Sequence, residues 1–413
     1  MTRRPRSMRS RLPAVWHVLG ADTTAVAQSL SALTISSVTA VGAGLALSAM
    51  TGTLAEIPGL LVLVPAAIGM RGNIFGALGS RLATAIHTGS FAISRRVDTV
   101  VGQNVVGALL LSGSIAIVLA GLARVAAAAF GLASAPVADL VVVSFVGASL
   151  SSLVVLVFTL ALASASVSRN WDLDNVNAPL VSAVGDVVTL PALFVGAQLV
   201  GIELFTPGFA VVALVASAAA FVLVVRSQLA LLAEIVRESL PVLVLAGVLV
   251  TIAGVAIEHR FEAFEEQPAL LILVPAALSG AGAIGGILAS QLSSKLHLGV
   301  IDTARFPQPA ARRDIAVAGA IAVPVFVLNG VLAEVASILG NRPGPGLVDM
   351  VAISLTGGLL ATCAVVIIAY YGAVAAVRFG VDPDTYGIPI VTSVVDLVGA
   401  WALVFAIATW GAG

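Results

Sequence analysis

Two aspartates, Asp186 and Asp396, stand inside long apolar segments of the chain, with apolar residues on both sides of each. A carboxylate at mid-membrane costs about 2.5–3.5 kcal/mol on insertion scales, so an aspartate in such a segment is a candidate functional group. Two carboxylates near a shared axis repel each other unless a cation or protons intervene. We therefore interpret the pair as a central ion site.

Small and hydroxyl-bearing residues accompany both aspartates. Ser182 and Thr392 each lie four residues before an aspartate, which is one turn earlier on the same helical face, and Thr189 lies one turn after Asp186. Their oxygens could serve an ion or its water shell. Small residues also simply let membrane helices pack closely, and the sequence leaves both interpretations open.

Further carboxylates lie where apolar segments begin. The turns 170–179 and 380–389 each hold two of them, and the four residues are Asp172, Asp174, Asp382 and Asp384. These turns predict either ordinary helix capping or a cytosolic cation vestibule. Glu56 and Glu266, at the outer start of their segments, are candidate entrance ligands or simple terminal charges.

The elements that must position these groups occur twice. Residues 56–89 and 266–299 align without a gap at an offset of 210 and share 17 of 34 positions. The same offset relates Asp186 to Asp396. A doubled carboxylate and a doubled Gly-rich segment predict a two-fold ion pathway. The first Gly-rich segment could unwind and expose carbonyls or the amide of Asn73.

Composition determines the broad class. Hydrophobic residues make up 59% of the 413 residues and charged residues only 10%, whereas soluble domains carry about a quarter charged residues. The chain is therefore a polytopic membrane protein. Its one cysteine, Cys363, excludes a disulfide framework and a cysteine-based zinc site.

A spanning helix needs roughly 20 apolar residues, and eleven segments meet that length. They lie near 26–50, 57–92, 100–131, 138–167, 178–202, 208–226, 239–257, 268–299, 315–339, 348–377 and 387–410. The second and eighth are long and rich in Gly and Pro, so we expect them to be tilted, broken or partly re-entrant. With the N-terminus inside, most arginines fall on the inner side, as the positive-inside rule requires.

The parity of the spans predicts how the halves are related. Five spans per repeat would invert the second repeat, and the unmatched segment near 208–226 restores its orientation. We therefore expect an all-α protein with two parallel repeats about an axis along the membrane normal. The predicted division is a basic N-terminus at 1–25, a first repeat at 26–205, a linking helix and loop at 206–238, and a second repeat at 239–413.

Ligand type indicates the ion. The doubled buried groups are carboxylates, hydroxyls and carbonyls, which suit Mg²⁺, Ca²⁺ or Mn²⁺ better than copper or zinc. The alternative is a membrane-embedded enzyme that uses Asp186 and Asp396 as an acid–base dyad. Equivalence by duplication argues against it, because a dyad usually needs unlike roles.

The motifs together resemble the MgtE-type magnesium transporters. The matching residues are Pro65, Gly69, Arg71-Gly72-Asn73, Ser80-Arg81-Leu82 and His87-Thr88-Gly89, with the Asp-rich turn, its proline and the mid-helix aspartates. The duplicated branch, the solute carrier divalent-cation transporters, is the closer match. The resemblance implies five helices per domain, Mg²⁺ passage between two domains, and magnesium binding at Asp186 and Asp396. The second repeat departs from the motif at 279–283, so the halves need not contribute equally.

The expected function is transport of divalent cations, Mg²⁺ above all, by a protein that is not an enzyme. We expect no cofactor besides the transported ion, no nucleic-acid partner, a lipid bilayer around the chain, and a pseudo-dimer that acts as a monomer. The expected location is the cell (plasma) membrane, with the N-terminus in the cytosol and the C-terminus outside. The residues leave channel and ion-coupled exchanger equally open.

Overall fold

The computed structural model describes residues 23–94, 96–169, 173–379 and 388–411. Helices make up these ranges, with turns and short loops between them and no strand. The helices of the first half are α2 (Thr23–Ala49), α3 (Thr51–Glu56), α4 (Leu60–His87), α5 (Val100–Ala129), α6 (Val137–Arg169) and α7 (Leu173–Ala197). Helix α8 (Phe205–Arg226) follows. Those of the second half are α9 (Ala230–Glu258), α10 (Phe261–Glu266), α11 (Leu270–His297), α12 (Pro309–Leu339), α13 (Leu347–Phe379) and α14 (Ile388–Trp410).

Eleven of these helices are long and apolar enough to cross a membrane, which confirms the predicted number of spans within the described ranges. The shortest has 22 residues, and at 1.5 Å per residue it reaches about 33 Å, slightly more than the hydrocarbon core. A helix satisfies its own backbone hydrogen bonds, which the lipid interior cannot do. Long apolar segments therefore fold as helices here.

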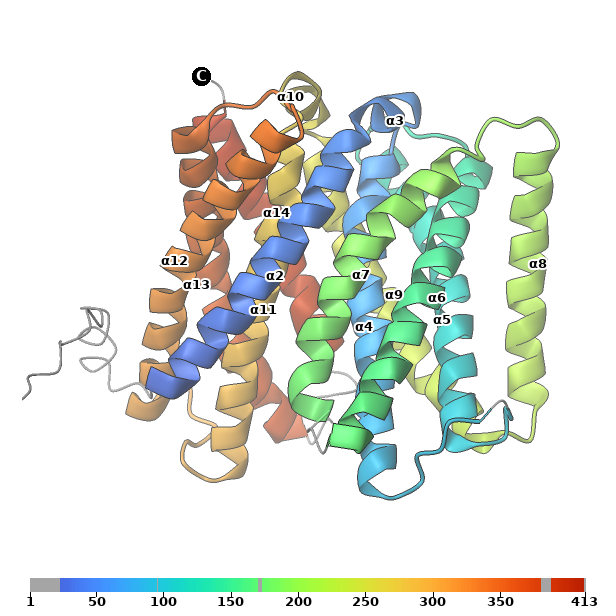
Figure 1. Ribbon diagram of the computed structural model, residues 1–413, viewed down its shortest axis with the longest axis horizontal. Coiled ribbons are helices and arrows are strands. Elements are labelled where there is room, and N and C mark those ends of the chain that lie inside the picture. The colour runs from blue at the N-terminus through green and yellow to red at the C-terminus, as the bar shows by residue number, and fades with distance from the viewer. Residues whose placement is uncertain (1–22, 95, 170–172, 380–387, 412–413) are drawn as a thin grey trace, which may run out of the picture.

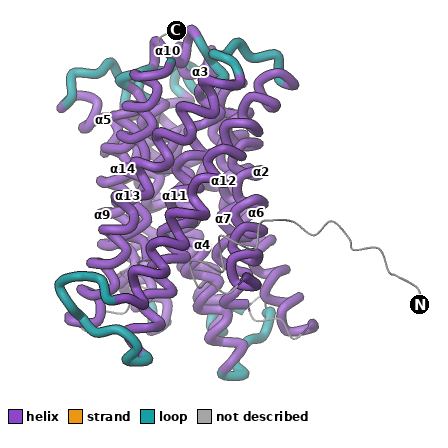
Figure 2. The backbone as a smooth tube through the Cα atoms, turned by 90° about the vertical axis from the view of Figure 1, so that its left-hand side faces the viewer, coloured by secondary structure: helices purple, strands orange, loops and turns teal. Residues whose placement is uncertain are grey.

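The two repeats run in the same direction, as the parity of the spans predicted. The short helices α3 and α10 occupy equivalent positions in the repeats, contact each other and lie at one end of the bundle (Figure 1, Figure 2). The loops that follow α4 and α11 both lie at the opposite end (Figure 1). Helix α8 stands at the edge of the bundle, mostly exposed, and supplies the extra crossing.

The first long helix of each repeat packs against the other repeat. Helix α2 crosses the bundle diagonally and packs on α11 and α12, while α9 packs on α4 and α5 (Figure 1). Helix α2 also contacts α7, and α9 contacts α14. Each half of the bundle thus contains four helices of one repeat and the exchanged helix of the other. Hydropathy cannot reveal this exchange, because a swapped helix is as apolar as an unswapped one.

Two equivalent glycines bring the exchanged helices close to their partners. A methyl group at Gly44 of α2 would overlap the carbonyl oxygen of Ile272 and lie 2.7 Å from its Cα. A methyl group at Gly254 of α9 would overlap the carbonyl oxygen of Val62 and lie 2.9 Å from its Cα. Small residues at such crossings let helix backbones approach.

The expectation that the Gly-rich second and eighth segments are broken or re-entrant is wrong. Helices α4 and α11 continue without interruption through Pro65 and Pro275, and Asn73 lies within the regular part of α4. Both helices are the most deeply buried of the described spans. Neighbouring helices on several sides therefore stabilise a helical backbone whose glycines alone would weaken it.

Candidate functional site

Helices α7 and α14 place the two aspartates inside the bundle, each within a predicted span. Asp186 is 4% exposed. Asp396 is half-buried. The two carboxylates lie near enough for the charge of Asp186 to act on Asp396. The structure thus brings together the two residues that the sequence singled out, although 210 positions separate them.

The immediate partner of each aspartate comes from the other repeat. Ser279 of α11 donates a hydrogen bond to Asp186 Oδ2 at 2.7 Å. A methyl group at Gly69 of α4 would lie 3.4 Å from Asp396 Oδ2. Gly69 and Ser279 are equivalent positions of the two repeats, at the offset of 210. The site is therefore built by both repeats, with each aspartate facing the Gly-rich helix of the other.

Polar residues that the sequence analysis proposed for the pathway also lie between α4 and its neighbours. Thr392 of α14 and Asn73 of α4 are linked by a long hydrogen bond of 3.5 Å, and Thr392 also donates to the carbonyl of Pro389 at 3.1 Å. The hydroxyl of Ser182 lies 3.6 Å from where a methyl group at Gly72 would stand. These contacts connect α4 to α14 of the second repeat and to α7 of the first.

Thr189 differs from these two hydroxyl residues. It is buried, and its hydroxyl donates at 2.6 Å to the carbonyl of Gly185, within its own helix. Its hydrogen is therefore used by the backbone, which is common for Thr in membrane helices. Within the described residues, Thr189 forms no hydrogen bond with either aspartate.

The predicted outer and inner carboxylates lie away from the aspartate pair or outside the described residues. Glu56 and Glu266 are exposed at the ends of α3 and α10. The following predicted vestibule residues lie outside the described residues or have side chains that are not described: Asp172, Asp174, Asp382 and Asp384. The vestibule therefore stays a prediction.

A buried arginine was missed as a site residue by the sequence analysis. Arg71 of α4 is 2% exposed, and its guanidinium donates to the carbonyl of Ala148 at 3.2 Å and to the hydroxyl of Ser152, both on α6. Its Cβ lies 3.2 Å from where a methyl group at Gly185 would stand, beside Asp186. The equivalent position in the second repeat is Ala281, so this charge has no counterpart there.

Ser279 was also missed, although the sequence carried a signal. The aligned repeats differ at 69 and 279, where the first has Gly and the second has Ser. A hydroxyl at a position aligned with a glycine motif, in a chain with a buried carboxylate, is a candidate hydrogen-bond donor to that carboxylate.

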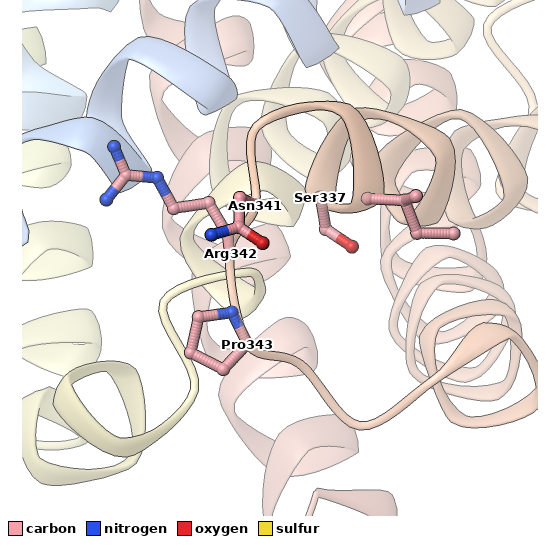
Figure 3. Close-up of a pocket in the computed structure, with 5 residues that line it drawn as sticks. Ser337, Asn341, Arg342 and Pro343 are labelled. Carbon is pink, nitrogen blue, oxygen red and sulfur yellow. The ribbon is translucent and has the colours of Figure 1, made fainter.

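A pocket of about 430 Å³ lies elsewhere, where α12 ends at the end of the bundle that carries α3 and α10 (Figure 3). It is lined by Ser337, Ile338, Asn341, Arg342 and Pro343, none of which the sequence analysis proposed. Figure 3 shows the Arg342 side chain directed away from the pocket, toward the N-terminal helices. The pocket is separate from the aspartate pair.

The donor set of the site matches a hard cation. Asp186 and Asp396 supply carboxylate oxygens, and Asn73 and Ser182 supply further oxygen atoms nearby. Within the described residues, no three side chains of His, Cys, Asp or Glu gather into a cluster. Oxygen ligands favour Mg²⁺, Ca²⁺ or Mn²⁺, and two carboxylates without a full cage suit an ion that keeps some of its waters.

The fold and the doubled site define a polytopic α-helical membrane protein built from two parallel repeats. The MgtE family, described as divalent cation transporters, matches the chain twice, over residues 64–196 and 274–406. The chain belongs to the MgtE family, which confirms the resemblance of its motifs, and the family implies divalent cation transport across a membrane. No solved structure matches the chain.

The two matched stretches run from α4 to α7 and from α11 to α14, at the offset of 210 seen in the repeats. The exchanged helices α2 and α9 lie outside both. The family is one of transporters, which speaks against the alternative of an intramembrane enzyme.

Proposed function

We propose that the chain transports Mg²⁺ between its two repeats, and that Asp186 and Asp396 bind the ion in a partly hydrated form. The observation that carries the proposal is that two mid-span carboxylates from different repeats each face the Gly-rich helix of the other repeat, Asp186 at Ser279 and Asp396 at Gly69.

Charge balance supports a divalent ion. Two ionised aspartates inside the membrane together cost about 5–7 kcal/mol on insertion scales, and their mutual repulsion adds to that. Among the described residues, no basic side chain forms an ion pair with either carboxylate. A bound dication neutralises both charges at once, which a monovalent ion cannot do.

Hydration supports Mg²⁺ within the divalent group. Mg²⁺ loses its waters reluctantly and is usually held by one or two carboxylates. Ca²⁺ takes six to eight oxygen ligands, which usually include several carboxylates and carbonyls. The two aspartates, with hydroxyl and amide oxygens nearby, fit the smaller demand of Mg²⁺.

The test is Mg²⁺ influx into proteoliposomes that contain a magnesium-sensitive dye. The native chain is compared with Asp186→Asn plus Asp396→Asn, with and without Na⁺ or H⁺ gradients. We expect influx in the double variant to fall to the leak of empty liposomes, because neutral amides leave the dication without its two countercharges. A response of native influx to a gradient would identify an exchanger, and no response would identify a channel.

The matched control changes two other equivalent aspartates. Asp139 and Asp349 lie in the first turns of α6 and α13, at the same offset of 210, away from the aspartate pair. We expect Asp139→Asn plus Asp349→Asn to keep native influx. If the Asp186→Asn plus Asp396→Asn variant elutes like the native protein and still shows full Mg²⁺ influx, the proposed site is refuted.

We further propose that the arginine-rich end of the bundle faces the cytosol and that the protein lies in the cell membrane. Arginines are exposed at that end, at Arg96, Arg226, Arg237 and Arg305, while exposed glutamates lie on α10 at the other end. In a Cys363→Ser background, an impermeant maleimide added to intact cells should label Ala133→Cys but not Ser94→Cys. The reverse labelling would invert the orientation.

A single chain should suffice for transport, because one chain supplies both aspartates. Proteoliposomes reconstituted at fewer than one chain per vesicle should therefore transport Mg²⁺, with the fraction of active vesicles proportional to protein. A dependence on the square of the protein amount would show that two chains are required.

A further inference from the structure

The two aspartates of the proposed site are not in equivalent surroundings, although the repeats are. Asp186 is bonded by Ser279, whereas Asp396 faces Gly69 at the equivalent position of the other repeat. Within the described residues, no hydrogen bond reaches the carboxylate of Asp396. One aspartate thus has a hydroxyl donor where the other has none.

The two aspartates also differ in burial, and Asp186 is the more buried one. Asp186 is 4% exposed. Asp396 is half-buried, so as a residue it is the less buried of the two. The hydrogen bond from Ser279 occupies one of the lone pairs of Asp186 Oδ2, so that carboxylate offers fewer free lone pairs to a cation than the carboxylate of Asp396, which faces a glycine.

From this geometry we propose that Asp396 is the first of the two carboxylates to accept the cation, and that Ser279 is a positioning residue that holds Asp186 until the ion arrives. The inference rests on the proposed function and adds an order of events to it. The chemical class of the ligand is the same divalent cation, with its waters, and the residue pair 69 and 279 determines which aspartate leads.

The inference can be tested by exchanging the residues at positions 69 and 279, because the surroundings of Gly69 admit a larger side chain. A methyl group there would lie 3.4 Å from Asp396 Oδ2 and 4.0 Å from Val250 Cγ1, which are ordinary contact distances. Gly69→Ser can therefore place a hydroxyl beside Asp396 without overlap, and Ser279→Gly removes the hydroxyl beside Asp186. The double exchange mirrors the native arrangement.

The experiment measures equilibrium binding of Mn²⁺, as a spectroscopic substitute for Mg²⁺, to the full chain in lipid nanodiscs. In the native background we expect Asp396→Asn to weaken binding at least about tenfold more than Asp186→Asn, since a hydrogen bond to a charged group corresponds to about a tenfold or larger change. In the Gly69→Ser plus Ser279→Gly background, the order of the two neutralisations should reverse. A general loss of packing would weaken both alike and would reverse nothing.

Single changes at Ser279 give a second readout. Ser279→Ala should tighten Mn²⁺ binding up to about tenfold, because the lone pair of Asp186 Oδ2 that accepted the hydrogen bond becomes available to the cation. Ser279→Thr keeps the hydroxyl and should bind as the native chain does. The matched control is Ser354→Ala, which removes a buried hydroxyl of α13 that donates to the carbonyl of Phe326 on α12 at 2.7 Å and makes no hydrogen bond to either aspartate. It should leave Mn²⁺ affinity unchanged.

The outcomes separate this inference from the proposed function. Equal effects of the two neutralisations in both backgrounds would overturn the inference and leave the proposed site in place. Unchanged binding in both single Asn variants would overturn the proposed site itself. If the doubly exchanged chain does not fold, the effects of Asp186→Asn and Asp396→Asn on Mn²⁺ affinity are compared in the Ser279→Ala background. There the two effects should differ less than in the native background. An unchanged difference would refute the role of Ser279.

Discussion

The close crossing of α2 over α11 gives the sharpest prediction of stability. Gly44→Ala places a methyl group 2.7 Å from the Cα of Ile272, and carbon atoms in contact are normally separated by about 3.5–4.0 Å. The obstacle is backbone, so no side-chain rotation relieves it, and the two helices must separate by about 1 Å. Overpacking of this kind costs about 1–3 kcal/mol, and Gly254→Ala at the equivalent crossing should add a similar amount.

The assay is thermal denaturation of detergent-purified protein, followed by the loss of the monodisperse elution peak. Gly42→Ala is the matched control, because it lies on the same helix, is exposed, and would meet nothing within 4 Å. We expect Gly42→Ala to be neutral or slightly stabilising, since alanine favours a helix over glycine by about 1 kcal/mol. If Gly44→Ala denatures at the same temperature as Gly42→Ala, the exchange of α2 between the repeats is not the arrangement of the native protein.

Two further predictions concern charged side chains. Lys295 of α11 and Asp314 of α12 form a pair whose side chains are only 30% and 13% exposed, and Nζ lies 2.7 Å from Oδ1. Asp314→Asn should therefore lower stability by about 1–3 kcal/mol. Asp98→Asn, in a pair that is 55% exposed at the aspartate, should lower it less, because solvent screens that pair. Equal thermal shifts would contradict this. Arg71→Met should tighten Mn²⁺ binding a few-fold in nanodiscs, because it removes a buried positive charge from α4, the helix that packs on α7. Weaker binding would show that the guanidinium supports the site.

The two repeats share a hydrogen bond that joins their helices, but they differ in the residues beside the two aspartates. Ser144 donates to the carbonyl of Ala116 at 2.8 Å, and the equivalent Ser354 donates to that of Phe326 at 2.7 Å, so both repeats join their helices by the same bond. At the aspartates the equivalent positions carry Gly69 and Ser279. The duplication therefore preserves helix packing while the surroundings of the two carboxylates differ.

The pathway residues illustrate what could be predicted and what could not. Asp186 and Asp396 were predictable because a carboxylate inside an apolar segment is costly and its doubling is visible in the alignment. Arg71 and Ser279 were not assigned roles, because their partners lie on other helices, at Ser152 and Asp186. Only the packing of α4 on α6 and of α11 beside α7 determines those contacts.

The sequence by itself determined the membrane class, the eleven spans, the doubling and the paired aspartates. Each of these depends on local quantities, namely the apolar length needed to cross a bilayer and the match of one segment to another. The tertiary structure decided that α2 and α9 change places and that α4 and α11 remain continuous helices. It also decided that Ser279 bonds only one aspartate. The physical reason is that lipid is as apolar as the helices themselves, so hydrophobicity places a helix in the membrane, whereas its neighbours are chosen by close packing and hydrogen bonds between distant segments.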